Sequence, residues 1–303
     1  MSEIPRRRLG RTGLDVTILG FGAMELHGSK ERHAGRSVSP EEATAVLNEV
    51  LDAGINYLDT SPDYGISEDC IGTISHRRDE FFLASKVGCP VGETVIPKGE
   101  RLPHDYSRGN IVRAVEQSLR RMRTDHLDLA QVHMSPPMTA LVEHGTVETL
   151  QGLQRDGKVR FIGISSTLPH ITDHLAAGVF DVIQVPYSAL QQEHDAVMHD
   201  IDRAGLGLVV RGGVAKGGLE SGRGARAVWD PLLAADMSDL LADMTMMAFM
   251  LRFTLGHPSL STAIVGTQRV EHVRSNAAAA ARGPLPADIH QEFARRLEKL
   301  PAA

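Results

Sequence analysis

Residues 206–211 read Leu206-Gly207-Leu208-Val209-Val210-Arg211, a short apolar run that ends on a charged side chain. A run of this kind is typical of a parallel strand that is buried on both faces. The chain contains eight such runs, and the segments between them carry apolar residues three or four positions apart, as amphipathic helices do. The runs span residues 16–19, 55–58, 81–84, 127–132, 159–164, 182–185, 206–210 and 261–265.

Three of the intervening segments carry clear helix signals. Pro40 follows Ser39, a typical N-cap residue, and Gly54 ends that segment. A stripe of apolar residues over 111–122 predicts a second helix. A third helix begins near Val147 and ends at Gly157.

Alternation of eight strands with helices predicts a closed (β/α)8 barrel, a TIM barrel, as a single domain over residues 1–303. Eight units in 303 residues leave about 38 residues for each, which suits a βα repeat. A doubly wound open sheet is the alternative, but it usually carries G-x-G-x-x-G after its first strand. Here that turn reads Gly20-Phe21-Gly22-Ala23-Met24, which does not match.

Four segments exceed the needs of a plain barrel. Residues 6–15 are expected to form an N-terminal hairpin that caps the bottom of the barrel, and residues 286–298 an extra C-terminal helix. Residues 89–108 and 212–231 are expected to be long loops, which in compact domains are usually functional or disordered.

Composition restricts the class of protein. A net charge of −6 argues against nucleic acid as a partner, because such proteins usually carry a basic face. Two cysteines are too few for a disulfide scaffold, and we expect a reduced, cytoplasmic protein without a signal peptide. The apolar stretch 244–255 contains Arg252 and is too short to span a membrane, so a buried helix is expected there. No interface stripe stands out, and the oligomeric state stays open.

Polar residues at the carboxyl ends of barrel strands are candidates for catalysis. Asp59, Lys86 and His133 lie at three successive strand ends, and Tyr64 follows Asp59 in the same loop. Reduction of a carbonyl develops negative charge on oxygen, and a proton donor must neutralise it. A tyrosine has a pKa near 10, and a neighbouring lysine ammonium favours its phenolate form. A carboxylate holds that lysine charged, while an imidazole donor orients the carbonyl oxygen.

The same residues carry a resemblance to a known family. The segments 56–65, 83–87 and 127–133 are similar to three signatures of the aldo-keto reductases. This resemblance implies an NADPH-dependent reductase that converts an aldehyde or ketone to an alcohol by hydride transfer from nicotinamide. It makes Tyr64 the general acid, Lys86 the residue that tunes it, Asp59 the partner of the lysine and His133 the orienting donor.

The resemblance also implies a cofactor site across the barrel mouth. Ser165, Ser166 and Gln184 would bind the nicotinamide carboxamide, although family members usually have Asn where this chain has Ser166. Arg211 stands where many members carry an aromatic residue, so it would stack on nicotinamide, bind the diphosphate or contact the substrate. Backbone groups at Gly22, Ala23 and Met24 would face the ribose and nicotinamide, and Gly212, Gly213, Val214 and Lys216 the diphosphate.

The stretch after the last strand decides between NADPH and NADH. Family members use lysine or arginine here to hold the 2′-phosphate, and this chain retains Arg269, which can bind phosphate in a bidentate manner. Asn276 would contact adenine. NADPH is therefore favoured, with NADH open as the alternative. The positions assigned to this end of the cofactor are Gly266, Thr267, Gln268, Arg269, His272 and Asn276.

The mouth of the pocket reads as mostly apolar, which suits a small carbonyl compound with a hydrophobic body. Its expected residues are Met24, His27, Val87, Met134 and the loop around Trp229.

No metal site is expected, because no pair of histidines has the H-E-x-x-H spacing. The histidines weighed for that role are His126, His170, His174, His194 and His199.

A second class of function remains open. The potassium-channel β-subunits of the same family resemble this chain around the four catalytic positions. A cofactor-binding regulatory subunit with little or no turnover is therefore the alternative to an enzyme, and turnover separates the two.

Overall fold

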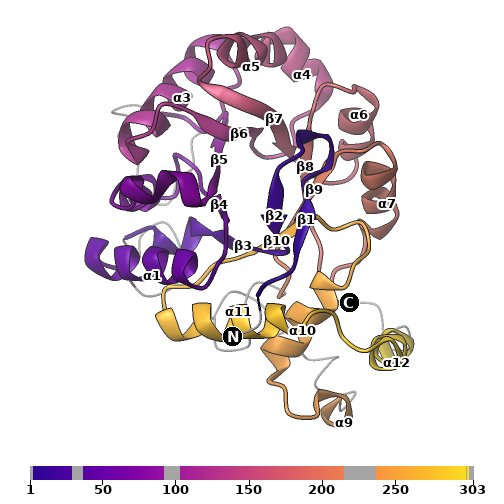
Figure 1. Cartoon of the computed structure of the whole chain (residues 1–303). Helices are drawn as coiled ribbons and strands as arrows, with labels where there is room; N and C mark the ends of the chain where they lie inside the picture. The colour runs from indigo at the N-terminus through magenta and orange to yellow at the C-terminus, as the bar shows by residue number, and fades with distance from the viewer. Residues whose placement is uncertain (1–2, 29–36, 92–102, 215–236, 298, 300–303) are drawn as a thin grey trace.

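The computed structural model describes residues 3–28, 37–91, 103–214, 237–297 and 299. Eight parallel strands close into a barrel in the order β10-β3-β4-β5-β6-β7-β8-β9 (Figure 1). The (β/α)8 prediction is confirmed, and the open-sheet alternative is wrong. The barrel strands are β3 (Leu19–Gly22), β4 (Tyr57–Asp59), β5 (Phe82–Val87), β6 (Leu127–Val132), β7 (Val159–Ser165), β8 (Val182–Pro186), β9 (Gly207–Arg211) and β10 (Thr262–Val265).

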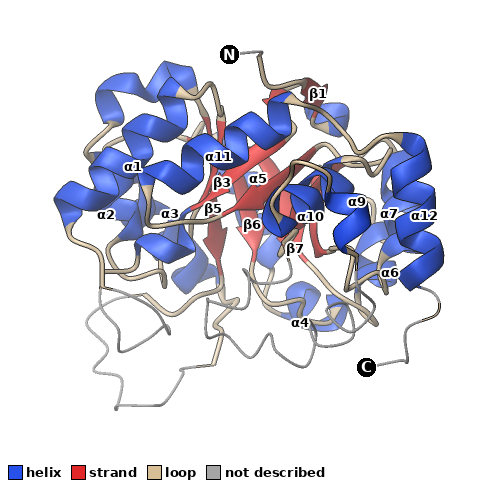
Figure 2. Cartoon of the chain, turned by 90° about the horizontal axis from the view of Figure 1, so that it is seen from below, coloured by secondary structure: helices blue, strands red, loops and turns tan. Residues whose placement is uncertain are grey.

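Helices surround the barrel in the part of the chain that the structure describes (Figure 2). Ser39 caps α1, since its side chain accepts from the backbone N–H of Glu42 while the Glu42 carboxylate accepts from that of Ser39. The helices are α1 (Pro40–Asp52), α2 (Ser67–Gly72), α3 (Arg108–Met122), α4 (Met138–Glu143), α5 (Thr146–Arg155), α6 (Ile171–Ala176), α7 (Asp195–Arg203), α9 (Ser238–Leu241), α10 (Met246–Leu255), α11 (Val270–Ala281) and α12 (Ala287–Leu297). Short 3-10 helices occupy η1 (Gly10–Thr12), η2 (Ala23–Leu26) and η3 (Ser75–Glu80).

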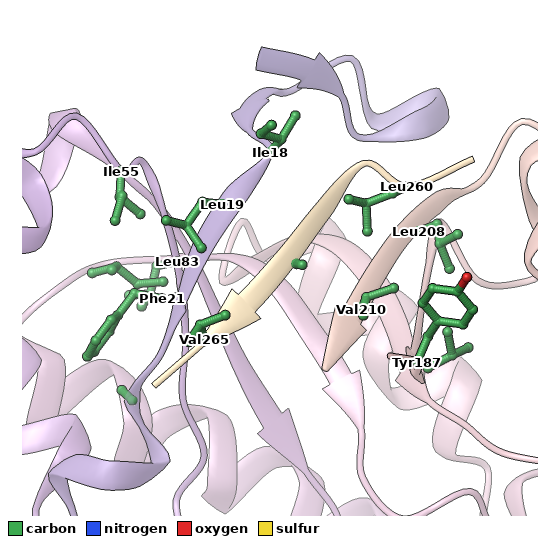
Figure 3. Close-up of a cluster of buried hydrophobic side chains, with 14 of the residues drawn as sticks. Ile18, Leu19, Phe21, Ile55, Leu83, Tyr187, Leu208, Val210, Leu260 and Val265 are labelled. Atoms are coloured by element: carbon green, nitrogen blue, oxygen red, sulfur yellow. The ribbon is translucent and has the colours of Figure 1, made fainter. Parts of the chain in front are cut away.

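The strands are buried on both faces, as their apolar sequences predict. In β9, Leu208 and Val210 belong to the large core between strands and helices, whereas Val209 belongs to a smaller core inside the barrel. Figure 3 shows Leu208 and Val210 beside Val265 and Leu260 in the large core. Because successive side chains of a strand point to opposite faces, one apolar run fills both layers.

An N-terminal hairpin closes one end of the barrel. Its strands β1 (Arg6–Arg8) and β2 (Asp15–Thr17) pair antiparallel, and Leu9 and Val16 pack into the core inside the barrel. The arrowheads of the barrel strands in Figure 2 point away from the end where β1 lies. The hairpin therefore covers the amino ends of the strands and leaves their carboxyl ends for the site.

Several strands begin or end a few residues from the predicted bounds, and the first barrel strand differs most. The run 16–19 was expected as the first barrel strand, but residues up to Thr17 pair with β1, and the barrel strand is Leu19–Gly22. Pairing with the hairpin satisfies the backbone of residues 15–17, so the chain enters the barrel only after Ile18. Gly20 and Gly22 consequently lie within β3 and not in a turn that follows it.

The C-terminal helix α12 docks through Phe293, which is fully buried. Its ring meets Phe249 at 4.8 Å and Phe253 at 5.4 Å between centroids, both edge to face. The extra helix is thus confirmed, and α10 is the buried helix expected over the apolar stretch 244–255. Among the described residues, no helix has the length and apolarity that crossing a membrane requires. The long loops expected at 89–108 and 212–231 fall largely outside the described ranges.

Candidate active site

A buried ion pair forms the centre of the site at the carboxyl ends of β4 and β5. Lys86 Nζ donates to Asp59 Oδ1 at 2.5 Å and to the Thr60 carbonyl oxygen at 2.9 Å. Both charged side chains are only 2% exposed. Nζ also lies 4.9 Å from the centre of the Tyr64 ring. The structure thus brings together three of the four residues that the sequence assigned to catalysis.

The loop that carries Tyr64 is fixed by local hydrogen bonds and one glycine. Tyr64 N–H donates to the Ser61 carbonyl, and the Tyr64 carbonyl accepts from Ser67. Gly65 has φ +57°, and a Cβ there would stand 2.1 Å from the carbonyl oxygen of His27. Because L-residues rarely adopt this conformation and no room exists for a side chain, glycine is required. Tyr64 is therefore held in one position above Lys86.

Burial and charge set the protonation states of this centre. Burial opposes the charged form of Lys86, but the interactions of the ammonium with Asp59 and Tyr64 together outweigh that cost and raise the pKa of Lys86 above its usual value. Burial raises the pKa of Tyr64 to about 12, although the Lys86 ammonium acts in the opposite direction. The sequence predicts that the lysine governs the pKa of Tyr64; in the structure burial has the larger effect, and Tyr64 is a protonated phenol at neutral pH.

The second oxygen of Asp59 is held by two amides. Gln131 Nε2 donates to Asp59 Oδ2 at 2.7 Å and Gln184 Nε2 at 2.9 Å. Gln131 was not among the residues predicted from the sequence, although it lies on β6 two positions before His133, a spacing at which extended residues point to the same side. Gln184 was expected to bind the carboxamide. Its Oε1 is buried and has no partner among the described residues, so an acceptor remains for an amide group of a cofactor.

His133 follows β6 and lies beside Tyr64, with 6.2 Å between the ring centroids. Burial and then the Lys86 charge lower the pKa of His133 to about 3, so the ring is neutral at physiological pH. Its Nδ1 lies 3.1 Å from Cys89 Sγ and 3.3 Å from His104 Nε2. With Nδ1 turned toward these groups, Nε2 remains to carry a proton toward a ligand.

The two serines after β7 differ in what their side chains contact. Ser165 ends the strand and is 5% exposed. Ser166 Oγ lies 2.7 Å from His174 Nδ1, and His174 Nε2 lies 2.7 Å from the Pro136 carbonyl oxygen. Since a carbonyl only accepts, His174 carries its proton on Nε2, and the Ser166 hydroxyl donates to Nδ1. That donor is thus already used within the protein, while the assignment of Ser166 to the carboxamide stays a prediction.

Residues assigned to the cofactor come together where β3, β9 and β10 end. A Cβ on Gly266 would stand 2.4 Å from the Gly22 carbonyl oxygen, so β10 and β3 meet closely there. Arg211 ends β9, and burial lowers its pKa while the nearby Tyr64 and Asp59 act in the opposite direction. This places Arg211 next to the catalytic centre. Ala23 and Met24 lie on η2; Gly212, Gly213 and Val214 follow β9; and Lys216 lies outside the described residues.

The stretch between β10 and α11 forms the other end of the candidate site. Gln268 Nε2 donates to the Glu25 carbonyl oxygen at 2.8 Å. Thr267 Oγ1 accepts from the Arg269 N–H and lies 3.2 Å from His272 Nδ1. Arg269 is exposed and stands at the N-cap position of α11. Thr267 and Asn276 line one small hollow with Phe21, and the assignment of Asn276 to adenine stays a prediction.

The expected substrate mouth is only partly described. Met24 is half-buried, His27 and Val87 are buried, and Met134 is 56% exposed. Trp229 lies outside the described residues. The apolar character of this edge therefore rests on Val87 and the two methionines.

Comparisons with known proteins identify the family. The model described as the Aldo/keto reductase family matches residues 18–297. An uncharacterized oxidoreductase of Bacillus subtilis (strain 168), YqkF, is 29% identical over 293 residues, covering 91% of this chain and 90% of the relative. L-galactose dehydrogenase of Arabidopsis thaliana is 28% identical over 301 residues, covering 92% of this chain and 89% of the relative. The holo form of the aldo-keto reductase AKR11C1 from Bacillus halodurans matches with a TM-score of 0.84 and 30% identity, covering 100% of this chain and 98% of that one. The chain belongs to the aldo/keto reductase family, whose oxidoreductases bind a nicotinamide cofactor.

Proposed function

We propose that the protein reduces an aldehyde or ketone to an alcohol with NADPH, and that Tyr64 is the general acid. The observation that carries this proposal is the buried Asp59–Lys86 pair beneath the Tyr64 ring. Stability alone does not account for a buried ion pair beneath a phenol, because the cost of removing two charges from water can exceed their attraction. The same arrangement supplies a proton donor and stabilises the anion that remains.

Each side chain then has a defined task. Bound nicotinamide supplies the hydride. The Tyr64 hydroxyl donates its proton to the substrate oxygen as negative charge develops there. Lys86, which hydrogen-bonds Tyr64, stabilises the resulting phenolate, and Asp59 keeps the lysine charged and in place. Neutral His133 donates from Nε2 to the same substrate oxygen and orients it.

The residues between β10 and α11 favour NADPH over NADH. Arg269 stands exposed at the start of α11, where backbone N–H groups and the helix dipole also favour an anion. Its guanidinium forms no ion pair within the described residues, whereas Arg274 on the same helix is bound by Glu49 at 2.8 Å through both nitrogens. Arg269 is thus the cation available for a 2′-phosphate.

The test of the reaction is NADPH oxidation with a panel of aromatic and aliphatic aldehydes and ketones. Tyr64→Phe should lower kcat by about 10²- to 10⁴-fold, the usual contribution of a general acid, while NADPH binding measured by fluorescence persists. Tyr57→Phe is the matched control, because its buried hydroxyl has no partner among the described residues and its loss should leave turnover unchanged. Parent-like turnover in Tyr64→Phe would refute the assignment. Tight NADPH binding without turnover of any carbonyl in the parent would favour the regulatory subunit.

The test of cofactor choice compares two arginines of one segment. Arg269→Ala should raise KM for NADPH by about tenfold or more and leave KM for NADH unchanged, because only NADPH carries the 2′-phosphate. Arg274→Ala, which removes a cation already paired with Glu49, should affect neither. Equal effects of Arg269→Ala on KM for both cofactors would contradict a role of Arg269 in binding the 2′-phosphate.

We expect a cytoplasmic enzyme acting on a small carbonyl compound, with neither nucleic acid nor membrane as partner.

A further inference from the structure

Four potential metal ligands, His133 among them, converge from segments far apart in sequence. Asp63 lies in the loop after β4, Cys89 after β5, His104 before α3 and His133 after β6. Each offers one ligand atom, and the four atoms all lie within 4.8 Å of one another. We call these four residues the Cys89 cluster. No metal was expected from the sequence, because no pair of histidines has the H-E-x-x-H spacing, and these four residues were not among those considered as ligands. They are separated by 26, 15 and 29 residues, and the barrel brings them together.

The separations among the ligand atoms fit tetrahedral coordination. Cys89 Sγ lies 3.1 Å from His133 Nδ1 and 3.8 Å from His104 Nε2, and the two nitrogens are 3.3 Å apart. Zinc binds nitrogen and sulfur at about 2.0–2.3 Å, so its tetrahedral ligands stand about 3.3–3.8 Å from each other. The thiol and the two imidazole nitrogens therefore need shifts of only a few tenths of an ångström to enclose an ion, and the Asp63 carboxylate lies within 4.8 Å of all three.

The backbone that carries the cluster is fastened before any ion arrives. Asn110 Nδ2 donates to the carbonyl oxygens of Cys89 at 3.0 Å and Asp105 at 2.7 Å, which ties the segment holding His104 to that holding Cys89. Tyr106 Oη donates to the His133 carbonyl oxygen at 2.8 Å, and its ring stacks on His104. Such supporting contacts orient ligands and raise the affinity of metal sites.

We propose that the Cys89 cluster binds Zn²⁺ or a similar thiophilic divalent cation. A thiolate, two imidazoles and a carboxylate are the donors that Zn²⁺ prefers, while Mg²⁺ and Ca²⁺ prefer oxygen alone. On binding, the Cys89 S–H bond breaks, the proton leaves to solvent and an Sγ–metal bond forms, with no change of oxidation state. The two anionic ligands, Asp63 and Cys89, balance the charge of the ion.

Metal binding at this place acts on the catalytic histidine. Four protein ligands fill a tetrahedral shell, so no position remains for substrate on the ion. The metal holds His133 through Nδ1 and thereby fixes the tautomer that carries its proton on Nε2. The cluster thus links the availability of metal to the orientation of one residue of the active site.

Cobalt provides the test, because Co²⁺ replaces Zn²⁺ and reports thiolate coordination by absorbance. The reduced full-length protein, freed of metal by chelation, is titrated with Co²⁺ in the absence of oxygen. We expect one Co²⁺ per chain, a thiolate-to-cobalt charge-transfer band, intense visible bands of tetrahedral cobalt, and displacement by Zn²⁺. Absence of the charge-transfer band in the parent would overturn the proposal and leave a hydrogen-bonded cluster only.

Matched variants locate the site. Cys89→Ser should abolish the charge-transfer band, and His104→Gln should weaken Co²⁺ binding by about tenfold or more. Cys70→Ser, which changes the other buried cysteine, should keep the full spectrum, as should His199→Gln, which disrupts the thiol-free group of Asp195, His199 and His257. A band retained in Cys89→Ser, or lost in Cys70→Ser, would refute the assignment. Circular dichroism verifies folding, and His104→Gln keeps the test decisive if Cys89→Ser does not fold.

Discussion

The buried Lys86–Asp59 pair allows one prediction to be worked through in energy. Both side chains are 2% exposed, and Nζ and Oδ1 lie 2.5 Å apart. Removing one member of a buried ion pair costs about 3–5 kcal/mol, because the other charge stays buried without its counterion. Replacing both members by neutral groups of similar volume is often close to neutral. We therefore expect strong non-additivity between Asp59→Asn and Lys86→Met.

The two single variants should differ in their loss of stability, because each leaves a charge that keeps different hydrogen-bond partners. Asp59→Asn leaves the ammonium with the Thr60 carbonyl oxygen at 2.9 Å and the Tyr64 hydroxyl. Its loss of free energy of unfolding should therefore lie at the upper end of about 3–5 kcal/mol. Lys86→Met leaves the carboxylate with the amide donors of Gln131 and Gln184, so its loss of free energy of unfolding should lie at the lower end of the same range. The double variant should be more stable than either single variant.

Urea unfolding followed by circular dichroism gives the four free energies of unfolding, provided that the slope with denaturant is shared. The coupling free energy should reach about 5 kcal/mol or more, above the usual range for residues in contact, because the single variants together cost about 8 kcal/mol and the double variant less than about 3 kcal/mol. The same cycle at Arg274 and Glu49, a pair whose arginine is 62% exposed, should give little coupling. A double Asp59→Asn/Lys86→Met variant as unstable as the sum of its single changes would refute the reasoning.

Three further predictions concern the loop, a buried histidine and the last helix. Gly65→Ala should lower stability and turnover together, since its Cβ would strike the His27 carbonyl, whereas Gly54→Ala, with φ +83° but open space, should reduce stability alone. Burial lowers the pKa of His174 below 6.5, so the contribution of the neutral ring to stability is complete above about pH 6.5 and is lost on acidification. His174→Gln should therefore make the melting temperature fall less steeply between about pH 7 and pH 5. An unchanged slope would count against this role of His174. Phe293→Ala should cost about 3–5 kcal/mol in denaturant unfolding, because it empties the contact of α12 with α10; a loss below about 1 kcal/mol would show that the helix docks by other means.

The sequence determined the barrel because its signals are local. Short apolar runs, the Ser39 cap and the polar residue at each strand end are all read within a few positions, and parallel strands place their carboxyl ends on one side. The clustering of Asp59, Lys86 and His133 followed from that rule, and Tyr64 was added to them by the chemistry of proton donation and the family resemblance. The boundary at Ile18 did not, because pairing with Arg6–Arg8 competes with the barrel for the same residues.

The tertiary structure decided what depends on distance and burial between segments far apart in sequence. The pKa of Tyr64 is governed by burial as well as by Lys86, and no sequence pattern reports burial at a loop. The amides of Gln131 and Gln184 meet Asp59 from strands 72 and 125 residues away. Cys89 and His104 reach His133 in the same way. Local sequence sets which element forms, whereas electrostatic and ligand interactions depend on which elements the closed barrel brings within a few ångströms.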